Sequence, residues 1–147
     1  MEQETYDRLL NHAYRLLSRR PQSEQELRMK LHQYGYKRKL DYLQDSIEQV
    51  ITVLYKQNYL DDATFAEWYV SQRQEFRPRS KRRLSMELSQ KGISEDISQK
   101  ILETYDEEGV LNKLIEKKKN LYSREELIDY LLKQGFPYSL IEDRLSA

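Results

Sequence analysis

Apolar residues recur every three or four positions along most of the chain, with charged and polar residues between them. This spacing places the apolar side chains on one face of an α-helix, and no stretch alternates as a half-buried strand does. The pattern therefore predicts an all-α protein. Besides the three segments described next, the expected helices cover residues 5–18, 40–55, 61–76, 97–105, 109–121 and 140–145.

One pattern occurs three times, at residues 23–36, 80–93 and 123–136: Ser-x3-Leu-x3-Leu-x3-Gly followed by an apolar residue. The serine is a preferred helix N-cap, and in the first and third copies a glutamate three residues later completes a capping box. Leucines four apart share one buried face. The glycines, Gly35, Gly92 and Gly135, are expected to end each helix in the left-handed conformation, with the next apolar residue folding back on the second leucine. Each copy thus predicts one complete helix.

A further amphipathic segment precedes each copy and another follows it, which predicts three tandem three-helix repeats at residues 1–60, 61–108 and 109–147. Each repeat is too small to bury its apolar face alone, so the repeats are expected to stack on their neighbours. Asp61 and Asp62 stand where the second repeat begins. We interpret them as helix caps, not as metal ligands.

The composition favours a protein without catalytic chemistry. The 147 residues are 38% apolar and 34% charged, as expected of a soluble helical protein, and the absence of cysteine excludes disulfides and thiolate chemistry. The lack of cysteine is consistent with a reducing compartment, so we expect a cytoplasmic protein by default. No apolar run approaches the roughly 20 residues that span a bilayer. His12 and His32 lack companions at metal-ligand spacing, and no phosphate-binding loop or catalytic triad is visible. No enzyme activity, metal or cofactor is expected.

The charges balance overall, with 25 Lys+Arg and 25 Asp+Glu, but they are unevenly distributed. Cations gather around the second copy of the repeated pattern, and acids follow at residues 94–108. In the first and third copies the opening turn carries glutamates, which suit the positive end of a helix, whereas the second carries Lys81, Arg82 and Arg83. This reversal forgoes roughly 1–2 kcal/mol of favourable dipole interaction. The cationic residues of this region are Arg73, Arg77, Arg79, Lys81, Arg82, Arg83 and Lys91.

Such a cluster at a helix start is a candidate site for an anion, either a phosphate of single- or double-stranded DNA or a carboxylate cluster on a protein. Helical spacing predicts that Arg82 points away from the buried leucines. The competing interpretation is internal pairing with the acids of residues 94–108. A secondary basic patch, Lys117, Lys118 and Lys119, is consecutive and cannot face one way on a helix, so ordinary solvation is favoured there. The tyrosines and Trp68 are interpreted as core and rim packing.

Residues 59–94 resemble the central motif of the RecX family, regulators of the RecA recombinase. The matching residues are Tyr59, Leu60, Asp61, Asp62, Phe65, Ala66, Tyr69, Val70, Arg73, Arg79, Arg82, Arg83, Leu84, Leu88 and Gly92. The resemblance implies an elongated, curved, right-handed-type array that lies along the groove of the RecA–DNA filament. It also implies restraint of RecA's ATPase, strand exchange and coprotease activities in DNA recombination, DNA repair and the SOS response. We expect the chain itself to be a monomer. Two alternatives stay open: a helical scaffold that binds acidic peptides, and a direct binder of single-stranded DNA.

Overall fold

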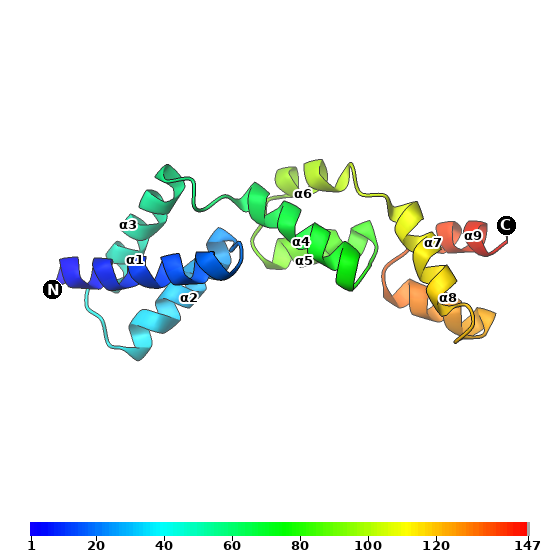
Figure 1. Cartoon of the computed structure of the whole chain (residues 1–147), viewed down its shortest axis with the longest axis horizontal. Coiled ribbons are helices and arrows are strands. Elements are labelled where there is room, and N and C mark those ends of the chain that lie inside the picture. Colours follow the sequence, from blue (N-terminus) through cyan, green and yellow to red (C-terminus); the bar gives the residue numbers. More distant parts are fainter. Residues whose placement is uncertain (147) are drawn as a thin grey trace. The chain divides into compact units, whose positions relative to one another are not determined.

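The regular structure of the chain is entirely helical over residues 1–146, the part that the computed structural model describes (Figure 1). This confirms the all-α repeat fold, and each helix lies within a few residues of its predicted position. None of these helices combines the length and apolar character needed to cross a bilayer. In chain order they are α1 (Glu2–Arg19), α2 (Glu24–Lys37), α3 (Leu43–Lys56), α4 (Asp62–Phe76), α5 (Lys81–Gln90), α6 (Glu95–Leu102), α7 (Glu107–Lys118), α8 (Arg124–Lys133) and α9 (Tyr138–Leu145).

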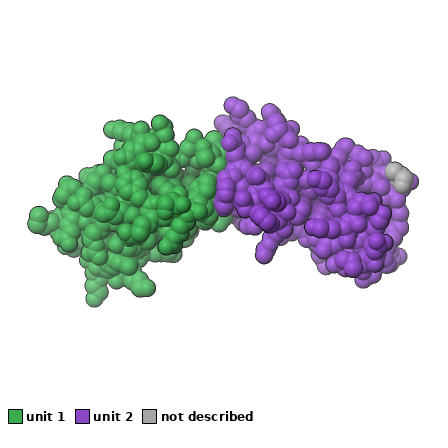
Figure 2. Space-filling model, in the orientation of Figure 1, with its two compact units in different colours: residues 1–66, 91–93 green, residues 67–90, 94–147 purple. Residues whose placement is uncertain are grey.

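Two compact units divide the molecule (Figure 2). Unit 1 comprises residues 1–66 and 91–93, and unit 2 comprises residues 67–90 and the chain from residue 94 onward. Helix α4 contributes to both units. The division into three repeats, with limits near residues 60 and 108, stays a prediction.

Unit 1 is built around one hydrophobic core to which α1, α2 and α3 all contribute. Both leucines of the first repeated pattern, Leu27 and Leu31, are completely buried in it. They are joined by apolar residues that recur at helical spacing on α1 and α3, which explains why those two segments are helical. The core residues are Leu9, Ala13, Leu27, Leu31, Ile47, Val50, Ile51, Leu54 and Leu60.

The serines of the repeated pattern begin their helices as predicted. Ser23 Oγ accepts the backbone N–H of Glu26 at 3.1 Å, and the Glu26 carboxylate accepts the N–H of Ser23 at 3.2 Å. Ser123 and Glu126 form the same capping box, with distances of 3.2 and 3.0 Å. Ser80 Oγ accepts the N–H three residues later at 3.0 Å. Local hydrogen bonding thus fixes the starts of α2, α5 and α8.

Two of the three pattern glycines are left-handed, as predicted: Gly92 has a φ of +82° and Gly135 a φ of +93°. The prediction for Gly35 is wrong, because α2 continues to Lys37 and the left-handed residue is Lys39, with a φ of 56°. Position 35 requires glycine for another reason: a Cβ there would lie 2.1 Å from Cδ1 of Leu43. The glycine lets the chain at the start of α3 approach α2 closely.

Because α2 ends later than predicted, a different apolar residue follows its left-handed residue. Lys39 N–H donates to Tyr36 O at 3.1 Å and Leu40 N–H donates to Gly35 O at 3.0 Å, the pair of bonds that defines a Schellman cap. Leu40 therefore takes the capping position that the pattern assigned to Tyr36. As a result Tyr36 is 83% exposed, contrary to the packing expected of it.

Glu26 is a buried carboxylate surrounded by donors. It is 6% exposed and accepts hydrogen bonds from Arg20, at 3.2 and 3.1 Å, and from Lys91, at 3.0 Å, in addition to the backbone of Ser23. Burial by itself would raise the pKa of Glu26, but the hydrogen bonds from Arg20, Lys91 and Ser23 outweigh it and lower the pKa from 4.5 to about 2. The ionised form is therefore strongly favoured in the folded chain.

This lowered pKa predicts a loss of stability in acid. Because the folded pKa lies below the unfolded one, the contribution of Glu26 is complete above pH 4.5 and is lost as the pH falls towards 2. We expect about 2 kcal/mol, after allowance for the partial exposure of the two cations. Urea unfolding followed by circular dichroism at pH 6 and pH 3 should show that the stability difference between wild type and Glu26→Gln at pH 3 is only about half of its value at pH 6.

The matched control is Glu126→Gln, which removes the same capping-box carboxylate at a site that is exposed and has no cationic partner among residues 1–146. Its effect on stability should be small. A difference between wild type and Glu26→Gln that stays constant from pH 6 to pH 3 would contradict the prediction.

Unit 2 fixes the start of α5 against two other segments. Tyr105, which follows α6, donates its hydroxyl to Arg79 O at 2.6 Å, and Ser80 N–H donates to Gln134 O at 3.4 Å. A Cβ on Gly135 would lie 2.3 Å from Ser80 Oγ, so only glycine permits this approach. Burial raises the pKa of the Tyr105 phenol to about 12, so it remains a donor. The basic residues around α5 are thus attached to a rigidly positioned backbone.

Candidate partner-binding surface at the start of helix α5

The start of α5 already has an anion supplied by its own unit. Lys81 N–H donates to the carboxylate of Glu107 at 2.8 Å, and Ser80 Oγ accepts the N–H of Arg83. Glu107 lies in the first turn of α7. It offers negative charge to the positive end of α5, which offsets part of the unfavourable field predicted from the sequence. The helix end itself is therefore partly satisfied, and any external anion would have to be bound by side chains.

Glu87, on α5, collects several of the basic side chains. Its carboxylate pairs with Arg79, lies 3.4 Å from Arg83 Nε and lies 3.8 Å from Arg73 Nε. Tyr69 donates its hydroxyl to the same carboxylate at 2.8 Å. The Glu87 side chain is only 16% exposed. We call these residues the Glu87 cluster; three guanidinium groups share one carboxylate, so the cluster carries two net positive charges.

Arg79 is an internal residue of this cluster. Its side chain is 11% exposed, and its Nε donates to Arg77 O at 3.0 Å in addition to the Glu87 ion pair. The sequence expectation placed Arg79 on the surface. It lies inside because its backbone C=O accepts a hydrogen bond from the Tyr105 hydroxyl while its guanidinium group forms an ion pair with Glu87. The role that this geometry supports for Arg79 is structural.

Arg73 and Arg83 occupy the edge of the cluster. The guanidinium of Arg73 lies 4.8 Å from the centroid of the Tyr69 ring, a cation–π contact. Arg83 Nη1 donates to Gln134 Oε1 at 2.9 Å, which links α5 to the end of α8. Both residues are half-buried, and both are partly committed to contacts within unit 2.

The remaining cations of this region are Arg77, Lys81 and Arg82. Within residues 1–146 none of their side chains forms an ion pair. Arg77 and Arg82 are exposed and Lys81 is half-buried. The exposure of Arg82 follows from its place opposite Leu84 and Leu88, as the helical spacing predicts. These three residues form what we call the α5 basic surface.

A hollow of about 700 Å³ is lined by residues on either side of Arg77 in the sequence, although not by Arg77 itself. Gln74, Glu75 and Pro78 line one side of it, and α7 lines the other. Phe76, the last residue of α4 and the neighbour of Arg77 in sequence, is 69% exposed. An exposed aromatic ring, residues that line an open hollow, and cations without ion pairs thus occur within one short stretch of sequence, residues 74–82. This combination of apolar and cationic features is typical of protein-binding surfaces.

The other predicted cations lie elsewhere. Lys91 belongs to unit 1 and binds Glu26. In the secondary patch Lys119 pairs with Glu116 at 2.9 Å, Lys118 lies 5.5 Å from the Tyr130 ring centroid, and Lys117 is exposed. The three lysines thus have three different surroundings.

The acids of residues 94–108 contribute less to internal pairing than the competing interpretation expected. Glu108 pairs with Arg144, and the Glu95 carboxylate accepts a hydrogen bond from Gln99 at 3.0 Å. Among these acids it is Glu107 that reaches the start of α5, through a backbone amide. The carboxylate that pairs with the arginines is Glu87, within the basic stretch itself.

The two aspartates of the motif cap different helices. Asp61 accepts the N–H of Ala63 at 2.9 Å and so caps α4, whereas Asp62 accepts the N–H of Glu24 at 2.9 Å, at the start of α2. Capping is confirmed, but the partner of Asp62 is 38 positions away in sequence and carried no local signal. Among the described residues there is no cluster of potential metal ligands.

The other motif residues are structural in several ways. Tyr59 is 60% exposed, with its ring in edge contact with Tyr14 at 5.7 Å. Gly92 has the left-handed backbone described above. The completely buried members are Phe65, Ala66, Leu84 and Leu88.

Comparisons with known proteins place these features in a family. Residues 10–54 match the first three-helix domain of RecX and residues 61–102 match the second. The regulatory protein RecX of Caldanaerobacter subterraneus is 30% identical over 141 residues, which cover 92% of this chain and 68% of that protein. The regulatory protein RecX of Prosthecochloris aestuarii is 32% identical over 142 residues, which cover 92% of this chain and 90% of that protein.

The fold comparison agrees. The crystal structure of RecX from Lactobacillus salivarius matches with a TM-score of 0.78 and 24% identity, covering 97% of this chain and 96% of that one. Two domain matches, relatives covered over most of their length and a shared fold support one conclusion. This chain belongs to the RecX family.

Proposed function

We propose that this chain is a non-catalytic regulator that binds the RecA–DNA filament and restrains RecA's ATPase, strand exchange and coprotease activities. Its membership of a family whose members are named regulatory proteins is the observation that carries the proposal. A regulator that works by binding requires a surface for its partner, and it requires no reactive group.

The α5 basic surface is the proposed contact with the filament. Arg77, Lys81 and Arg82 have no ion pair within residues 1–146, so binding an anionic partner would not first have to break an internal pair. The filament offers carboxylates on its protein subunits, and exposed Phe76 beside Arg77 supplies an apolar contact that favours a protein partner. Arg79 is excluded from this contact because it is buried against Glu87.

The test is ATP hydrolysis by RecA assembled on single-stranded DNA. The wild-type chain should suppress hydrolysis at stoichiometric amounts. The variant Arg77→Glu/Arg82→Glu should need at least about ten times more protein for the same suppression, a loss of about 1.4 kcal/mol in binding. Its thermal stability should be equal or slightly raised, because a carboxylate in the first turn of α5 suits the positive end of that helix.

The matched control is Lys100→Glu/Lys133→Glu, which makes the same change in charge at two exposed residues of unit 2 outside the α5 basic surface. It should suppress hydrolysis like the wild type. If the wild-type chain leaves hydrolysis unchanged, the proposed function is refuted. If the wild-type chain suppresses hydrolysis but both double variants behave alike, the proposed function is upheld and the assignment of the contact to the α5 basic surface is refuted.

A further inference from the structure

Unit 1 carries a row of arginines that the function proposed above does not use. Arg8, Arg15 and Arg19 lie on α1, with His12 between the first two. Positions 8, 12, 15 and 19 fall on one face of an uninterrupted helix. At a rise of 1.5 Å per residue the row extends about 16 Å from Arg8 to Arg19.

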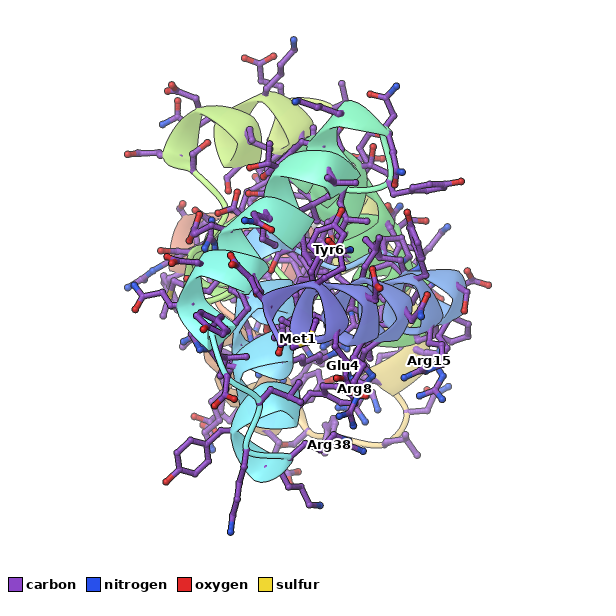
Figure 3. The ribbon with its side chains drawn as sticks, turned by 90° about the vertical axis from the view of Figure 1, so that its left-hand side faces the viewer. Met1, Glu4, Tyr6, Arg8, Arg15 and Arg38 are labelled. Atoms are coloured by element: carbon purple, nitrogen blue, oxygen red, sulfur yellow. The ribbon has the colours of Figure 1, made fainter. Side chains whose placement is uncertain are left out.

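A fourth guanidinium joins this row from the end of α2. The ring of His12 stacks on Tyr34 with centroids 4.0 Å apart and planes at 19°, and Cζ of Arg38 lies 3.9 Å from the centroid of Tyr34. Two groups this close to one ring centroid must occupy opposite faces, so Tyr34 is enclosed between His12 and Arg38. Arg8, Arg15 and Arg38 project on the same side of α1, opposite Tyr6 (Figure 3).

One carboxylate, Glu4, lies on the same side of α1 one turn before Arg8 (Figure 3), but the positive charge of the row is in excess. In residues 1–146 none of Arg8, Arg15, Arg19 and Arg38 forms an ion pair, whereas Arg28 in the same unit pairs with two glutamates. The excess positive charge also acts on the neighbouring ring of His12. Burial, followed by the charges of Arg15, Arg38, Arg19 and Lys30, lowers the pKa of His12. The neutral ring can accept from Arg15, whose Nη2 lies 3.4 Å from His12 Nδ1.

We propose that Arg8, Arg15, Arg19 and Arg38 bind the phosphodiester backbone of a nucleic-acid strand. A guanidinium group matches a phosphate in charge and in the geometry of its donors. A linear row of cations suits a linear polyanion better than a single anion. The tyrosine in the row is enclosed on both faces and cannot stack on a base, so the contact is with phosphates and is independent of base sequence.

The surroundings of the row favour nucleic acid over an acidic protein. The residues that alternate with the arginines on this face of α1 include Asn11 and Ser18, which are exposed and polar. Met1, at the N-terminus, is exposed on this side, but between Arg8 and Arg19 no large apolar side chain is exposed as an anchor for the centre of a protein interface. This contrasts with the α5 basic surface, where Phe76 adjoins the cations.

Fluorescence anisotropy with a labelled oligothymidine of about 20 nucleotides, and with a duplex of the same length, tests the proposal without RecA. If four phosphates are contacted, the slope of log affinity against log salt should be roughly −2.8 for the single strand and roughly −3.6 for the duplex. Arg15→Gln/Arg19→Gln should reduce each slope by about half and weaken binding at least about tenfold at low salt. Unchanged circular dichroism would establish that the variant is folded.

Lys100→Gln/Lys133→Gln is the matched control, since it removes two exposed positive charges from unit 2. It should bind both probes like the wild type. Equal weakening by the two variants would overturn the proposal, because nonspecific charge would then explain the binding. Tighter binding to labelled oligoglutamate than to either nucleic acid would also overturn it, in favour of an acidic protein partner. Neither result would bear on the RecA assay.

Discussion

Replacing Glu87 by glutamine is expected to lower the free energy of unfolding of unit 2 by about 3 kcal/mol. Glu87 is the carboxylate that pairs with Arg79, whose side chain is 11% exposed, and removing one member of a buried pair leaves the other charged and desolvated. Arg73 and Arg83 lose the same partner, and the repulsion between the three guanidinium groups is no longer offset. Urea unfolding monitored by Trp68, the single tryptophan and a residue of unit 2, measures the change.

Two further variants separate the lost ion pair from other effects. Glu75→Gln removes an exposed carboxylate that has no ion pair in the described residues, and it should change stability by less than about 0.5 kcal/mol. The double replacement Arg79→Met/Glu87→Leu should recover much of the loss, because both members of the pair become apolar. A stability of Glu87→Gln within about 0.5 kcal/mol of wild type would show that the cluster is not stabilising.

Leu88→Ala is expected to cost about 2–5 kcal/mol of stability. Leu88 is completely buried, and truncating it removes apolar contacts and leaves a cavity that its neighbours fill only in part. Met86→Ala is the matched control: it shortens a side chain of similar size on the same helix, but Met86 is 55% exposed. Its effect should be below about 0.5 kcal/mol.

The same Trp68 fluorescence measurement serves for this pair. Equal effects of the two truncations would contradict the assignment of Leu88 to the core. The Leu88→Ala chain should also suppress RecA's ATPase less well near its unfolding midpoint, because the α5 basic surface exists only when α5 is packed.

Features that depend on neighbours in sequence were predictable. Helical periodicity located all the helices described, and Ser23, Ser80 and Ser123 begin their helices through bonds to amides three residues away. Capping by these serines and amphipathic spacing are local, so a single sequence carries them completely. The same holds for the buried leucine pairs. The motif that revealed the family is likewise a continuous stretch.

The division of roles among the arginines was not predictable. Arg79 and Arg82 stand three positions apart with the same charge, yet one is buried and the other is exposed. The contact between Arg83 and Glu87 could be anticipated from their spacing of four residues, but the contact between Arg79 and Glu87 could not, because Arg79 precedes the helix. For the row on α1, the spacing of Arg8, Arg15 and Arg19 is visible in the sequence, whereas their lack of ion pairs is not.

The sequence by itself determined which segments are helical, where the serine-capped helices α2, α5 and α8 start, which face is buried and to which family the chain belongs. The tertiary structure alone decided that Gly35 makes room for Leu43, that Glu107 caps α5 and that Arg79 is internal. The physical reason is the range of the interactions. Periodicity and serine capping act within one or two helical turns, whereas close packing, ion pairing and capping by a distant carboxylate join residues whose proximity is created only when the helices pack.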